Sequence, residues 1–177
     1  MKTEGNMNRE IPLEIERKYV IMLPDLDVLR GTEGYTVSRI TQTYLRSAPH
    51  VTHRVRRREY EGGTVYTETK KIRIDKISSF EDEREITEAE YTSLLDLKDG
   101  GATPVIKTRH TIPYDGLTVE IDVYPEWERT CIMEIELPSR ETRLNVPPFI
   151  TVVQEVTGDK RYSNAAMARS FPPELDV

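Results

Sequence analysis

The chain has 177 residues, of which 37% are hydrophobic and 32% are charged, and its formal net charge is −6 at pH 7. This length is typical of one domain, and the charged fraction exceeds the roughly 25% of an average soluble domain. The negative balance argues against sequence-independent nucleic-acid binding, which needs a basic face.

Cys131 is the only cysteine, which excludes an intrachain disulfide and a thiolate metal cluster and favours a reducing compartment. No stretch of about 18 apolar residues occurs, so we expect neither a membrane span nor a signal peptide, and we expect a cytoplasmic protein. We interpret residues 1–9 as a flexible leader and residues 10–177 as a single domain.

Segments with alternating side-chain character predict β-strands along most of the chain. Gly62-Gly63 and Asp115-Gly116 separate two pairs of these segments, which predicts two antiparallel hairpins. The eight strand-like segments are residues 13–21, 39–47, 52–60, 64–73, 80–87, 104–112, 117–124 and 130–137.

Helical signals are few and short. Thr87 can cap a helix over residues 87–97, with Glu90 completing a capping box. A second short helix is expected over residues 24–29, with Pro24 in its first turn and Gly31 just past its end. A third is expected over residues 163–170.

Charged residues recur at a spacing of two, which places them on one face of a strand. The sets are Glu14, Glu16 and Lys18; Arg54 and Arg56; Glu83 and Glu85; Lys107 and Arg109; Glu120 and Asp122; Glu134 and Glu136. The intervening Ile15, Val55, Ile121 and Ile135 would form an apolar face beneath the helices. An ordinary sheet also has one polar face, but same-sign neighbours repel one another there. Closing the sheet with its charged face inward would gather both signs in one lumen.

A lumen of this kind suits a polyanion that carries a metal ion. Carboxylates bind hard divalent cations such as Mg²⁺ or Mn²⁺, while arginine and lysine bind phosphate oxygens. The sequence contains no P-loop, G-x-G-x-x-G or G-x-S-x-G motif. His50, His53 and His110 lack the spacing of metal ligands.

The segment LEIERKYV resembles the E-x-E-x-K signature of the CYTH superfamily, the triphosphate tunnel metalloenzymes. TQTYL, HRVRR, KTRH, VEIDVY and IMEIEL follow in the family's order, and EVTGDKRYSNAAMA is similar to the ending of the small bacterial inorganic triphosphatases. The resemblance covers about Leu13 to Ala168. It implies a mainly β fold, a closed eight-stranded antiparallel barrel with a few flanking helices, which holds a linear triphosphate along its axis.

The resemblance also implies roles for individual residues. The metal-side carboxylates would be Glu14, Glu16, Glu120, Asp122, Glu134 and Glu136. The phosphate ligands would be Lys18, Arg54, Arg56, Lys70, Lys107 and Arg109, with Lys160 as a further candidate. Lys18, Tyr44, Glu83 and Glu85 would be catalytic, the two glutamates positioning a basic side chain or a metal-bound water. Tyr44 would be either a proton acceptor, with its pKa depressed by nearby cations, or a hydrogen-bonding wall residue.

One departure from the family pattern concerns the fourth strand. Similar proteins often carry threonine two residues before the lysine of this strand, whereas Glu68 precedes Lys70 here. Glu68 would either add a carboxylate to the tunnel or pair with a neighbouring arginine.

The expected activity is metal-dependent hydrolysis of the terminal phosphoanhydride of a triphosphate, inorganic tripolyphosphate first among the candidates. Alternatives are a class IV adenylate cyclase acting on ATP, a thiamine or nucleoside triphosphatase, and a non-enzymatic polyphosphate or nucleotide sensor. An ordinary polar-faced β-sandwich without a ligand is the remaining alternative. The expected partner is the small-molecule substrate, with no nucleic acid or membrane, and a homodimer is possible.

Overall fold

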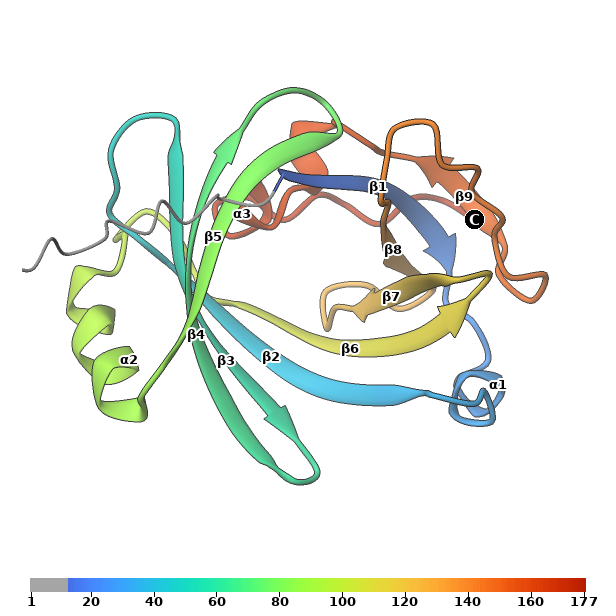
Figure 1. Ribbon diagram of the computed structural model, residues 1–177, viewed down its shortest axis with the longest axis horizontal. Helices are drawn as coiled ribbons and strands as arrows, with labels where there is room; N and C mark the ends of the chain where they lie inside the picture. The colour runs from blue at the N-terminus through green and yellow to red at the C-terminus, as the bar shows by residue number, and fades with distance from the viewer. Residues whose placement is uncertain (1–12) are drawn as a thin grey trace, which may run out of the picture.

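The computed structural model describes residues 13–177 and shows a strongly curved sheet with short helices around it (Figure 1). The predicted leader and residues 10–12 of the predicted domain lie outside the described residues. The strands are β1 (Leu13–Met22), β2 (Thr36–Leu45), β3 (Val51–Tyr60), β4 (Gly63–Arg73), β5 (Ser78–Ile86), β6 (Val105–Tyr114), β7 (Leu117–Val123), β8 (Thr130–Glu136) and β9 (Val152–Glu155). The α-helices are α1 (Leu26–Arg30), α2 (Glu88–Leu94) and α3 (Asn164–Met167), and the 3-10 helices are η1 (Leu95–Leu97) and η2 (Lys160–Tyr162).

The sheet closes into a barrel because β1 pairs with strands on both of its edges. Strand order is β5-β4-β3-β2-β6-β7-β8-β1, and every pairing is antiparallel. The first residues of β1 then pair with the start of β5, where Glu14 lies opposite Ser79. The predicted closed eight-stranded barrel is therefore confirmed. In the described part of the chain β9 is an addition to it, pairing with the later part of β1.

Both predicted hairpins are present, and their turn residues explain why. Gly63 has φ +147°, and Asp115 and Gly116 have φ of +51° and +73°. Glycine adopts positive φ without steric cost, and aspartate tolerates the left-handed region better than most residues. These turns set the registers of β3 with β4 and of β6 with β7.

The helices agree with the sequence in outline. Thr87 accepts a hydrogen bond from the Glu90 amide while the Glu90 side chain returns to Thr87, so the predicted capping box is confirmed. Helix α1 is capped by Asp25, and Gly31 forms its C-cap. The expectation that Pro24 lies in its first turn is wrong, because the Asp25 carboxylate accepts a hydrogen bond from the Asp27 amide and the helix starts at Leu26, two residues later. Helix α3 covers only the middle of residues 163–170.

The apolar residues between the charges form the outer face of the barrel, as predicted. Ile15, Ile121 and Ile135 are buried in one cluster with Leu29 of α1. Val55 is buried in a second cluster with residues of α2, which lies outside the barrel wall (Figure 1). Within residues 13–177, no helix has the length and apolar character needed to cross a membrane.

A third apolar cluster covers one end of the barrel. Val20 and Ile132 come from the inner faces of β1 and β8, Tyr124 directly follows β7, and Tyr162 and Met167 come from the C-terminal segment that packs on them. The cavity inside the barrel is therefore covered at this end by the chain's own C-terminal part.

Candidate functional site

The barrel encloses a cavity of about 700 Å³ whose walls are largely charged. Eleven of the predicted site residues line it: Glu14, Glu16, Lys18, Tyr44, Arg54, Arg56, Glu83, Arg109, Glu120, Glu134 and Glu136. Lys107 and Asp122 lie on the same inner face but are fully buried behind it. The alternation of charges in the sequence therefore identified ten charged residues of this wall.

Three predicted residues lie elsewhere. Glu85 is exposed and does not line the cavity. Lys160 is exposed at the start of η2 and does not line it either. Lys70 is exposed on the outer face of β4, opposite Asp82 of β5. The expected position of Lys70 in the lumen is wrong, because the hairpin register gives the inward place to its neighbour Lys71.

The inward position of Lys71 also restores the family pattern in the fourth strand. Thr69 lies two residues before Lys71, so the threonine-x-lysine pattern is present one residue later than expected. Glu68 then faces outward, where His53 lies 2.8 Å from one carboxylate oxygen and Arg84 lies 2.6 Å from the other. Of the two roles considered for Glu68, pairing with an arginine is confirmed.

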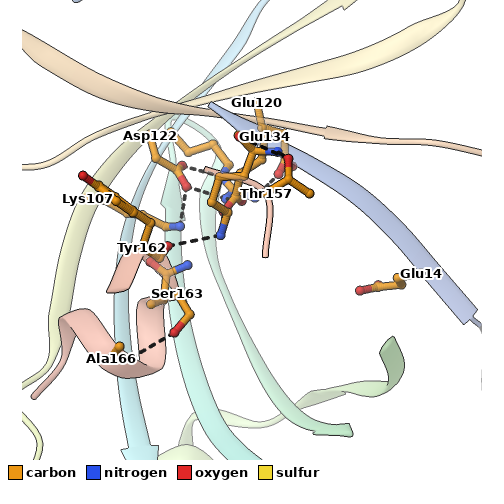
Figure 2. Close-up of polar contacts among 12 residues, drawn as sticks. Glu14, Lys107, Glu120, Asp122, Glu134, Thr157, Tyr162, Ser163 and Ala166 are labelled. Carbon is orange, nitrogen blue, oxygen red and sulfur yellow. Dashed lines mark hydrogen bonds and ion pairs between the residues drawn. The ribbon is translucent and has the colours of Figure 1, made fainter. Parts of the chain in front are cut away.

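A dense ionic network occupies the inner part of the lumen (Figure 2). Lys107 Nζ lies 2.5 Å from Asp122 Oδ2, and Arg109 makes two bonds of 2.6 Å to the same carboxylate. Arg109 also pairs with Glu120 and, at 2.8 Å, with Glu134. Lys18 lies 2.7 Å from Glu134 and 3.4 Å from the Tyr162 carbonyl oxygen. The network therefore joins β1, β6, β7 and β8 to the C-terminal segment.

This network already occupies one of the predicted metal ligands, Asp122. Burial favours the neutral form of the Asp122 carboxyl, but Arg109 and Lys107 outweigh it and lower its pKa. Burial and the adjacent Arg109 lower the pKa of Lys107 to about 8, despite the pairing with Asp122. Because Asp122 already holds two cations, it is placed to fix Lys107 and Arg109 and is poorly placed to receive a metal ion.

A second cluster surrounds Glu81, a residue that the pattern of paired charges did not single out. Arg54 lies 2.7 Å from Glu81 Oε1, and Lys71 lies 2.8 Å from Glu81 Oε2 and 3.5 Å from Glu14. Although burial opposes it, these two cations lower the pKa of Glu81 to about 2. Burial and the hydrogen bond to Glu81 raise the pKa of Glu14 to about 7.

Arg56 lies between these two clusters with little negative charge around it. Its nearest carboxylate is Glu83, at 3.7 Å. Burial, together with Arg54 and Arg109, lowers the pKa of its guanidinium to about 10. Arg58, two residues further on the same face, also lines the cavity, and within the described chain its Nε is buried without a hydrogen-bond partner. This row of inward arginines therefore favours an anion in the cavity.

Tyr44 lines the cavity beside this row, and its ionisation differs from the expectation. Burial is the largest effect and raises its pKa, although Arg54, Arg56 and Lys18 act in the opposite direction. The predicted depression of its pKa by cations is wrong, because desolvation of the phenolate outweighs their attraction.

Carboxylates without cationic partners lie on the wall formed by β1 and β8. Glu16 lies directly opposite Glu136, and neither forms a salt bridge with another residue of the 13–177 range. Burial and the nearby Glu120 and Glu16 raise the pKa of Glu136. No three acidic, histidine or cysteine side chains among the described residues already form a metal-binding group. The donor set nevertheless fits a hard divalent cation, which would relieve the repulsion between these two facing carboxylates.

A closed antiparallel barrel whose lumen is lined by both acidic and basic side chains is the CYTH-like triphosphate tunnel fold, and the chain has this fold. Among solved structures, it is similar to the inorganic triphosphatase NE1496, with 29% identity, a TM-score of 0.57, and coverage of 91% of this chain and 97% of that one. It also resembles the PH1819 protein from Pyrococcus horikoshii OT3, with 23% identity, a TM-score of 0.56, and coverage of 72% and 79% of the two chains. The latter similarity concerns the fold alone. No family model matches the sequence, and no curated protein matches it.

Proposed function

We propose that the protein hydrolyses the terminal phosphoanhydride bond of inorganic tripolyphosphate with the help of Mg²⁺ or Mn²⁺. The observation that carries this proposal is the division of one cavity into a cationic wall and a wall of unpaired carboxylates. A bound triphosphate satisfies the first, and a divalent cation satisfies the second. The similarity to the inorganic triphosphatase NE1496 over 97% of that chain supports the choice of substrate.

The inward cations would bind the substrate in extended form. Arg54 and Arg56 suit bidentate hydrogen bonds to phosphate oxygens, and Lys18 and Lys71 suit single charged hydrogen bonds. Asp122 holds Lys107 and Arg109 in place from behind. These fixed charges would stabilise the negative charge that develops during phosphoryl transfer without a covalent intermediate.

The carboxylate wall would hold the metal ion through Glu16 and Glu136, with Glu14 and Glu120 beside them. When bound, the cation supplies charge neutralisation at the phosphate oxygens. A water molecule then attacks the terminal phosphorus in line, the bond to the bridging oxygen breaks, and orthophosphate and diphosphate leave. The water gives up its proton as the new P–O bond forms, and a carboxylate of this wall lies in the same cavity to accept it.

The first experiment compares phosphate release from tripolyphosphate, ATP and thiamine triphosphate in Mg²⁺, Mn²⁺ or EDTA, together with cyclic AMP formation from ATP. Release that is fastest on tripolyphosphate and lost in EDTA is the expected result. Cyclic AMP with pyrophosphate would identify a cyclase instead. Tight binding without any product would identify a sensor.

Changing Glu14 or Glu16 to glutamine tests the carboxylate wall. We expect each variant to lose turnover by about 100-fold or more, since transition-state charge would no longer be neutralised in place. The folded structure should persist, because both side chains face the cavity. Thermal unfolding checks the fold, and wild-type turnover in both single variants would reject the assignment.

A further inference from the structure

Gln42 lies behind the cavity wall between two residues that line it. It projects from the inner face of β2 and has no exposed surface, while Tyr44 and Arg56 beside it reach the cavity. A buried side-chain amide is retained at little cost only when both of its ends find partners. Both ends of Gln42 are occupied.

The chemistry of Arg56 determines which way the amide faces. Arg56 Nε and Nη2 donate to Gln42 Oε1 at 3.3 and 3.2 Å. A guanidinium has no acceptor, so only the amide oxygen can face it. The amide nitrogen must then face Tyr44, and Nε2 donates to the phenol oxygen at 2.6 Å.

This arrangement restricts the proton of Tyr44. Because the phenol oxygen accepts a hydrogen bond from Gln42, its own proton must point in another direction. The charged neighbours on this side, Arg54, Arg56 and Lys18, can only donate hydrogen bonds when charged. Within residues 13–177 the Tyr44 hydroxyl donates to no protein oxygen, so an anionic oxygen of a ligand in the cavity is the acceptor that suits it.

We propose that Gln42 is a positioning residue that, held by Arg56, fixes Tyr44 as a hydrogen-bond donor to a phosphate oxygen of the substrate. This inference rests on the proposed function and assigns Tyr44 a role opposite to that of a proton acceptor. Burial, which favours the protonated phenol, is consistent with it. The chain of contacts runs from Arg56 through Gln42 and Tyr44 to the substrate.

The Gln42→Glu variant tests this chain with almost no change of shape. A carboxylate still accepts from Arg56, but it cannot donate, so the Tyr44 proton would turn toward it and away from the substrate. We expect the KM for tripolyphosphate to rise about 10-fold or more, the value of one hydrogen bond to a charged group, while kcat changes less than about 3-fold. Calorimetric titration with tripolyphosphate in EDTA should show the same loss of affinity.

A double-mutant cycle with Tyr44→Phe separates positioning from the repulsion that a new carboxylate adds. If Gln42 acts through Tyr44, Gln42→Glu should weaken binding by less than about 3-fold when the phenol is already absent, because the two effects are coupled. An equal loss in both backgrounds would overturn the inference. Gln154→Glu, the same change at an exposed position of β9, is the matched control and should alter neither constant.

The outcomes also separate this inference from the proposed function. Normal tripolyphosphate turnover by the wild type together with additive effects of the two substitutions rejects the role of Gln42 and leaves the function intact. A wild-type protein that neither binds nor hydrolyses tripolyphosphate rejects both.

Discussion

Two adjacent lysines of β4 have opposite environments. Lys71 reaches the cavity between Glu14 and Glu81, whereas Lys70 is exposed on the outer face. We expect Lys71→Gln to raise the KM for tripolyphosphate about 10-fold or more, because a charged hydrogen bond to phosphate is lost. Lys70→Gln is the matched control and should change KM less than about 2-fold. Steady-state phosphate release measures both, and the reverse ranking would show that Lys70 is the phosphate ligand.

The sequence could not distinguish these two lysines. Alternation shows that residues two apart share a face, but Lys70 and Lys71 are consecutive, so either frame fits. The hairpin turn at Gly63 decides between them by pairing Thr69 with the inward Arg54. The raised pKa of Tyr44 could not be predicted from the sequence for a different reason, since the extent of its burial depends on the C-terminal segment that packs around it.

Glu14 gives the metal-free protein a specific pH dependence. Its pKa is raised from 4.5 to about 7, so between these values the folded state binds more protons than the unfolded state. The free energy of unfolding should therefore fall as the pH rises through this window, and the contribution levels off above it. Urea denaturation of the wild type and Glu14→Gln checks this: the difference between them should change from about pH 4.5 to about pH 7. A difference independent of pH would contradict the raised pKa.

At the level of single elements, α2 depends on its N-cap residue, Thr87. Thr87 and Glu90 exchange hydrogen bonds at the helix start, and the helix covers Val55 and Ile86 of the barrel wall. Thr87→Ala should lower the free energy of unfolding by about 1 kcal/mol. Thr92→Ala, within the same helix and exposed, should not destabilise the protein. Chemical denaturation measures both, and equal losses would mean that the cap contributes nothing specific.

The sequence predicted eight strands and both hairpins because strand alternation and turn residues are local signals. It missed β9, a four-residue strand whose place depends on the free edge of β1. Its side chains show no clear alternation of burial, so the tertiary partner, and not the local pattern, determines that it is extended.

For the whole molecule, the C-terminal segment acts as a cover for one end of the barrel. Phe171 packs edge-on against Tyr124 and Trp127, with ring centroids 5.4 Å apart in each case, and the Trp127 indole donates to the Pro172 carbonyl oxygen. Phe171→Ala should cost roughly 2 kcal/mol, less than the 3–5 kcal/mol of a fully buried phenylalanine, because the ring is only half-buried. Thermal and chemical unfolding test this, and an unchanged stability would show that the end cover contributes little to folding.

The pairing of β1 also has a consequence for synthesis on the ribosome. The strand that carries Glu14, Glu16 and Lys18 is the first of the barrel to be translated, but its longest pairing is with β8, where Glu16 meets Glu136. Until β8 emerges, the apolar side chains of β1 are not stably buried, and Glu16 cannot lie opposite Glu136. Such long-range pairing forms slowly. The nascent chain therefore remains without a binding cavity until β8, which ends at Glu136, has been made and has left the ribosome, and chaperone demand should be greatest just before that point.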